Sequence, residues 1–160
     1  MMQRITRGEA EAVFHARGTG GFHGQGPSDA NRQVAIRPFY PSGLHYCVED
    51  WHVLALGLIV DEEHDGVPNL GEAKKLFDPV VMTFVLDGAP LETTRQPVKA
   101  FLGESPKGFV LVQGRLVAPG ELAAGSHTLT VTVENDPADP GVQVYTSQFF
   151  IDAAGTGACA

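Results

Sequence analysis

The stretch that decides the fold is Ser126-His127-Thr128-Leu129-Thr130-Val131-Thr132-Val133-Glu134, in which apolar and polar residues alternate without interruption. A period of two residues is typical of a β-strand that is buried on one side only. We expect the odd-numbered side chains, from His127 to Val133, to face a core and the threonines to face water. The stretch therefore predicts a sheet with one wet face.

Related patterns elsewhere in the chain predict further strands. They cover residues 45–60, 80–86, 91–95, 98–102, 108–117 and 142–151, and we expect a bulge at Gly114. A helix over residues 48–60 is the alternative for the first of them, because a short apolar run does not fix its period. Residues 61–78 are acidic and rich in turn formers, and residues 135–141 predict a hairpin loop. Strands at this spacing, with no helices between them, predict an all-β, antiparallel sandwich.

The chain has 160 residues, which suits one domain with its own core. We expect residues 45–160 to form the sandwich domain. Residues 1–44 are expected to form an N-terminal arm, with a short helix over residues 10–16 and an irregular part where glycines accumulate after residue 17.

The charge is acidic, with 19 Asp and Glu against 11 Lys and Arg, so electrostatic attraction to the phosphates of a nucleic acid is excluded as a main function. The longest apolar run of the chain, Val53–Val60, is far shorter than the roughly 18 residues that a membrane-spanning helix needs, so membrane insertion is not expected. The N-terminus has arginines but no apolar segment after them, so no signal peptide is visible.

Cys47 and Cys159 are the only cysteines, and we expect them to form a disulfide that ties the glycine-rich C-terminus to an early strand. Disulfides persist in oxidising compartments, so the expected location is extracellular or periplasmic. The alternative is a pair of unrelated thiols in a reducing cytoplasm.

The span from Pro79 to Asp152 resembles bacterial immunoglobulin-like or fibronectin-like modules. The resemblance is carried by Leu86-Asp87-Gly88-Ala89-Pro90-Leu91, by Leu122 through Val133, and by Phe149-Phe150-Ile151-Asp152. It implies an immunoglobulin-like β-sandwich and no particular function. The cysteines do not lie in the strands that antibody domains cross-link, and Trp51 follows Cys47 by only four residues, so antibody-type core packing is not implied.

Residues 61–72 have the spacing of a calcium-binding loop, with oxygen-bearing side chains at alternate positions and a glycine at the sixth. They resemble the loops of EF-hands and related extracellular calcium repeats. That resemblance implies calcium ligands from the side chains of Asp61, Glu63, Asp65, Asn69 and Glu72 and from the carbonyl group of Val67. Glu63 and Pro68 depart from the usual pattern, and the alternative is a solvated acidic turn.

Several potential ligands or nucleophiles gather between His45 and His52, namely His45, Cys47, Glu49, Asp50 and His52. On one strand these side chains would point to opposite faces, so we assign no catalytic residue and keep a small enzyme or a metal site as an alternative. His15 and His23 could join His45 in a metal site only by coincidence of folding. Aromatic residues of the first third are expected in the core, or else on a ligand-binding face; they are Phe14, Phe22, Phe39, Tyr40, Tyr46 and Trp51.

We therefore predict a non-catalytic binding or structural module of an exported protein, whose partner is a protein, a glycan or a small molecule. No cofactor other than calcium is indicated. The alternatives are an enzyme that uses residues 45–52, and a surface protein that forms homo-oligomers through its N-terminal arm. Enzyme activity is the less favoured interpretation, since the sequence contains no established catalytic motif.

Overall fold

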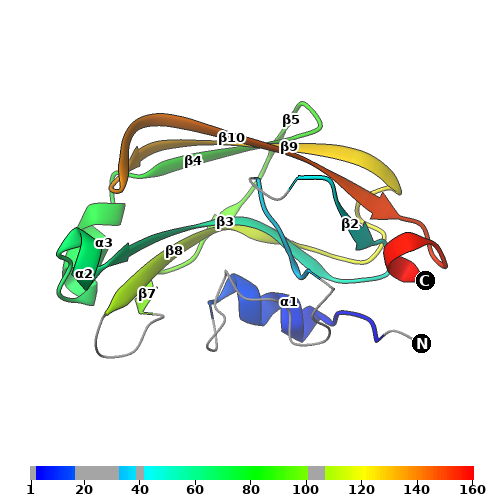
Figure 1. Cartoon of the computed structure of the whole chain (residues 1–160), viewed down its shortest axis with the longest axis horizontal. Coiled ribbons are helices and arrows are strands. Elements are labelled where there is room, and N and C mark those ends of the chain that lie inside the picture. The colour runs from blue at the N-terminus through cyan, green and yellow to red at the C-terminus, as the bar shows by residue number, and fades with distance from the viewer. Residues whose placement is uncertain (1–2, 17–32, 39–41, 101–106) are drawn as a thin grey trace.

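The computed structural model describes residues 3–16, 33–38, 42–100 and 107–160, which form two packed β-sheets (Figure 1). Sheet A has the order β1 (Ala35–Ile36), β3 (His52–Asp61), β8 (Gly108–Val117) and β6 (Thr94–Arg95), with β7 (Lys99–Ala100) also paired to β8. Sheet B has the order β2 (Leu44–Cys47), β10 (Asp139–Asp152), β9 (Gly125–Asp136), β4 (Val81–Leu86) and β5 (Ala89–Leu91). The predicted all-β sandwich is confirmed.

The two sheets are mixed, whereas the sequence predicted purely antiparallel pairing. β1 pairs in parallel with β3, and β2 pairs in parallel with the end of β10. The chain passes from β1 in sheet A to β2 in sheet B and back to β3, so neither pair is joined by a hairpin. Parallel pairs require such long connections, which strand periodicity alone does not reveal.

The alternation in residues 126–134 has the predicted consequence. Leu129, Val131 and Val133 of β9 are fully buried between the sheets, while Glu134 is exposed. Phe84 of β4 and Phe149 of β10 join them against sheet A. Burial of this continuous apolar layer is the main stabilising contribution to the fold.

Helix α1 (Arg7–Phe14) covers the outer face of sheet A (Figure 1). Its side chains Ala10, Val13 and Phe14 are buried in a second apolar cluster with residues of β3 and β8. Because sheet A is covered on both faces, nearly every side chain of β3 is buried, which explains the unbroken apolar run of that strand. The helix begins earlier than predicted because Thr6 and Glu9 form a capping box at its start.

The acidic connection after β3 contains two short helices, whereas the sequence predicts a turn-rich segment there. They are α2 (Glu62–Asp65) and α3 (Leu70–Phe77), and Asp61 and Asn69 cap their first turns. Phe77 and Ala73 are buried at one end of the sandwich (Figure 1). No helix in the described part of the chain is long and apolar enough to cross a membrane.

The strand irregularities lie elsewhere than predicted. β3 and β8 pair without a register shift from Asp61–Gly108 to His52–Val117, so Gly114 is not a bulge. The irregularity falls between Asp139 and Val142, because β9 and β10 extend into the expected hairpin loop. Gly114 instead allows a close backbone approach, since a Cβ there would lie 2.1 Å from the carbonyl oxygen of Leu54.

Candidate functional site

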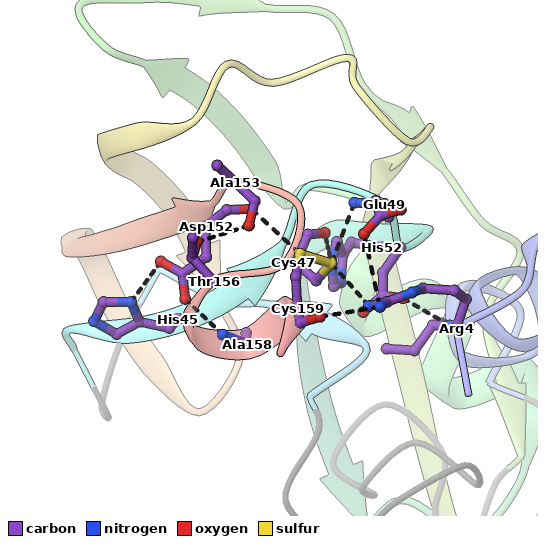
Figure 2. Close-up of a disulfide and its surroundings, with 12 residues drawn as sticks. Arg4, His45, Cys47, Glu49, His52, Asp152, Ala153, Thr156, Ala158 and Cys159 are labelled. Carbon is purple, nitrogen blue, oxygen red and sulfur yellow. Dashed lines mark hydrogen bonds and ion pairs between the residues drawn. A yellow bond between two sulfur atoms is a disulfide. The ribbon is translucent and has the colours of Figure 1, made fainter. Parts of the chain in front are cut away.

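The predicted disulfide between Cys47 and Cys159 is confirmed (Figure 2). It joins the end of β2 to the C-terminal 3₁₀ turn η2 (Gly157–Cys159), across a sequence separation of 112 residues. Both cysteines are buried. The bridge therefore fixes the last residues of the chain against sheet B.

Arg4 connects the N-terminus to both cysteines, a contact that the sequence did not reveal (Figure 2). Its Nη1 lies 3.0 Å from the Sγ of Cys47, and its Nη2 donates a hydrogen bond of 3.1 Å to the carbonyl oxygen of Cys159. The carboxylate of Glu49 lies 3.6 Å from the same guanidinium group. Both chain ends thus meet at the disulfide.

The His45–His52 cluster does not converge into one site. β2 ends at Cys47 and a turn follows, so the side chains no longer alternate as on a strand. Asp50 is buried and accepts a hydrogen bond from the backbone N–H of Ile5, and His52 is buried with its ring nitrogens near carbonyl oxygens. Cys47 is oxidised and can act neither as a nucleophile nor as a metal ligand in this state.

Metal-binding geometry is likewise poor. Among the described residues, the group of potential ligands that lie close together consists of Cys47, Glu49 and Cys159, and two of these are consumed by the disulfide. His15 is described but His23 lies outside the described residues, as do Phe22, Phe39 and Tyr40.

The core prediction for the remaining aromatic residues is borne out. Phe14 and Tyr46 are buried, and Trp51 is partly buried against the cluster beneath α1.

His45 lies on sheet B and is half exposed. Its Nδ1 is 2.8 Å from the Oδ1 of Asp152, and its ring stacks on Phe150 with a centroid distance of 4.7 Å. Burial alone would raise the pKa of Asp152, but hydrogen bonds from the Ala158 N–H and from His45 lower this pKa below its usual value. Thr156 is labelled beside the pair in Figure 2, and its hydroxyl group donates a hydrogen bond of 2.7 Å to the carbonyl oxygen of Ala153.

The predicted calcium loop is organised by helix capping. The carboxylate of Asp61 accepts hydrogen bonds from the backbone N–H of His64 at 2.6 Å and lies 2.9 Å from its Nδ1, and Asp65 accepts from the N–H of Asp61. Asn69 caps α3 by accepting from Glu72. Glu63 is exposed. Calcium binding by this loop stays a prediction, and it would have to compete with these hydrogen bonds.

The contact between Asp61 and His64 has a measurable consequence. The backbone and side-chain hydrogen bonds from His64 lower the pKa of Asp61, and the hydrogen bond to Asp61 raises the pKa of His64. Both groups are charged between these two pKa values, and the ion-pair contribution to stability is lost when pH falls through the pKa of Asp61 or rises through that of His64. By NMR titration we expect the pKa of His64 to lie above that of an unperturbed histidine, and Asp61→Asn to lower this pKa.

Glu63→Gln is the matched control, because the Glu63 charge raises the pKa of His64 less than Asp61 does. An unchanged pKa of His64 in Asp61→Asn would contradict the assigned contact. The same spectra test whether the loop binds calcium. A calcium ion bound to the Asp61 carboxylate would break the contact of that carboxylate with His64 and lower the pKa of His64.

In the described part of the chain, the outer face of sheet B exposes a strand surface of consistent composition. We define it by the outward side chains of β4, β9, β10 and β2. They are Val81, Thr83, Val85, Ser126, Thr128, Thr130, Thr132, Glu134, Val142, Val144, Thr146, Gln148, Phe150 and His45. Among these residues only Glu134 and His45 can carry a charge, whereas soluble surfaces are typically about a quarter to a third charged.

The side chains of this face form rows across the strands. Thr83, Thr132 and Val144 lie side by side, and the hydroxyl groups of Thr130 and Thr146 are 3.2 Å apart. At one end Val142 and Val144 are 60% and 63% exposed. The sequence revealed the wet threonine side of β9, but the valines became part of the same face only through strand pairing.

A hollow of about 250 Å³ lies between α3 and the β6–β7 connection. Its lining includes Lys74, Asp78 and Arg95 around the apolar side chains of Phe77 and Leu111. Arg95 also donates a hydrogen bond to the carbonyl oxygen of Val80. No histidine belongs to this lining in the described part of the protein, so the hollow offers no histidine for acid–base chemistry.

Comparison with known proteins adds little to this geometry. No family model matches the chain, and no curated protein matches it. One solved structure that is similar to it is the crystal structure of a cysteine protease inhibitor from Entamoeba histolytica. The two are 10% identical, with 73% of this chain and 92% of that chain covered, at a TM-score of 0.31. Such a likeness carries no argument about function, which is therefore inferred from the chain's own residues.

Proposed function

We propose that the protein is an exported, non-catalytic binding module of the immunoglobulin-like or fibronectin-like type, and that the outer face of sheet B binds a partner protein. One observation carries this proposal. Helix α1 covers the outer face of sheet A, whereas the outer face of sheet B exposes valines and threonines almost without charge. An uncovered face of this kind is the surface on which a partner gains most from burial.

The chemistry of the face favours a protein partner. The buried centres of protein interfaces are depleted in charged residues, as this face is. Covering Val142 and Val144 would contribute about 1 kcal/mol each from the apolar area that they now expose. The hydroxyl groups of Thr130 and Thr146 lie within hydrogen-bond distance of each other, which lowers the cost of removing them from water.

Two further features support export and binding over the alternatives. The disulfide between Cys47 and Cys159 requires an oxidising compartment to persist. Catalysis by residues 45–52 is less favoured, because His45 lies on the outer face of sheet B while His52 is buried and Cys47 is oxidised.

A charge placed in the middle of the face is expected to weaken binding. Thr132 lies on the central strand β9, so Thr132→Lys would bury an ammonium group in any complex that covers it. We expect the immobilised oxidised protein to retain a partner from the extracytoplasmic fraction of its host, and Thr132→Lys to weaken that affinity by at least about tenfold.

The matched control is Thr94→Lys, which makes the same change at an exposed position of β6 in sheet A. This variant should bind as the unmodified protein does. Amide hydrogen exchange of the complex should show protection in β4, β9 and β10. Full retention of the partner by Thr132→Lys, or protection confined to other strands, would refute the proposed surface. A captured species that resists protease and is released by glycosidase would instead identify a glycan ligand.

A further inference from the structure

Glu134 is the one acidic side chain among those that define the outer face of sheet B. It is exposed, and in the described part of the chain no hydrogen bond or ion pair involves its carboxylate. The other ionisable side chain of the face, His45, lies 2.8 Å from Asp152 and so has a counter-charge beside it. Glu134 is therefore the uncompensated charge of this face.

Glu134 lies in a row of exposed valines. It pairs with Val81 of β4 on one side and with Val142 of β10 on the other, and Cβ atoms of such cross-strand neighbours lie about 5 Å apart. Val81 is 48% exposed and Val142 is 60% exposed, and Val144 in the next row is exposed as well. Of the five large apolar side chains that the described residues leave exposed, three thus surround this carboxylate.

A partner that covers these valines must also cover the Glu134 carboxylate. Removing the valines from water favours binding, whereas removing an unpaired carboxylate from water opposes it strongly. A neutral partner therefore loses much of what burial of the valines contributes. A partner with a cationic group at this position instead forms an ion pair with Glu134, in which each charge offsets the cost of burying the other.

We infer that the partner presents an arginine or lysine side chain to Glu134, between apolar side chains that pack on Val81 and Val142. This inference rests on the binding role proposed above and specifies the chemistry of the partner. The net charge of −8 acts in the same direction, because it attracts cationic proteins over a longer range. Arginine suits the position best, since its guanidinium group is weakly hydrated and can donate two hydrogen bonds to one carboxylate.

Protection against aggregation is the other role that a charge on an exposed sheet can have, and it predicts a different result. Natural proteins use charged side chains of either sign to keep exposed strands from pairing with other chains. An ion pair with a cationic partner, in contrast, requires a negative charge at residue 134. The charge reversal Glu134→Lys therefore distinguishes the two roles.

The probe for this inference is a phage-displayed library of random peptides, selected on the immobilised oxidised protein at low salt. We expect the selected peptides to carry Arg or Lys next to apolar residues and to protect the amides of β4, β9 and β10 from hydrogen exchange. Their affinity should be at least about tenfold lower for Glu134→Lys, with a smaller loss for Glu134→Gln. Glu92→Lys is the matched control, because it changes the net charge equally at an exposed position between β5 and β6.

A charge swap completes the test. A selected peptide whose cationic residue is replaced by Glu should lose affinity for the wild type and regain it on Glu134→Lys. Peptides that protect the same strands but bind wild type and Glu134→Lys equally, or that contain no cationic residue, would overturn the inference and leave the proposed surface standing. Protection confined to other strands, or a selection that yields no peptide, would refute the surface and the inference together.

Discussion

Replacing both cysteines with alanine is expected to lower the free energy of unfolding by about 4–5 kcal/mol, because the disulfide closes a loop of more than a hundred residues. The bridge restricts the unfolded chain, and the entropy it removes grows with the logarithm of the loop length. For a chain of this size the loss corresponds to a decrease in Tm of about 10–20 °C. Urea unfolding followed by circular dichroism gives the free energy, and thermal scans give the Tm.

Measurements on the reduced wild-type protein separate the effect of the cross-link on stability from the effect of side-chain packing. Reduction keeps both buried sulfur atoms but opens the bond, so wild type in a reductant should approach the stability of Cys47→Ala/Cys159→Ala. The variant itself should not respond to reductant. A loss below about 1 kcal/mol in both would show that the unfolded chain is already restricted or that the bond is strained.

The location of the disulfide shows what a sequence can reveal about a site. Two cysteines in a β-rich chain suffice to predict the bond itself. Arg4 could not be predicted as its neighbour, because that contact depends on how the N-terminal segment crosses sheet A. Part of the outer face of sheet B could be predicted from the sequence, since alternation shows which side chains of β9 face water. The exposure of Val142 and Val144 depends on strand neighbours and was not visible.

A strand could be predicted wherever its own residues alternate between apolar and polar or form an apolar run. Alternation in β4 and β9 and the apolar run of β3 gave the strands and the sandwich. The parallel pairs could not be predicted because β1 and β2 are short and neither of them pairs with the strand that follows it in sequence. Helix α3 was missed because its apolar face consists of little more than Ala73 and Phe77, although Asn69 provides a recognisable N-cap.

Gly114→Ala is expected to destabilise the protein by about 3 kcal/mol, the upper end of what one added methyl group costs in a packed region. The new Cβ would lie 2.1 Å from the carbonyl oxygen of Leu54 and 2.4 Å from the Cβ of Ala55, both on the paired strand β3. These atoms belong to backbone or to the shortest side chain, so neither can rotate away. The strands would have to separate beneath α1.

Two control variants test whether the close approach of the strands causes the expected destabilisation by Gly114→Ala. Gly8→Ala, in α1, meets nothing closer than the Thr6 hydroxyl oxygen at 3.9 Å and should stabilise the protein by up to about 1 kcal/mol. Adding Ala55→Gly to Gly114→Ala removes one of the three clashes and leaves those with the Leu54 carbonyl oxygen and the Ala55 Cα, so the double variant should recover part of the loss, as coupled neighbours do. Urea unfolding of all four proteins measures these differences. A Gly114→Ala protein within about 0.5 kcal/mol of wild type would mean that the strands do not approach so closely, and the unbroken register of β3 and β8 would then need another explanation.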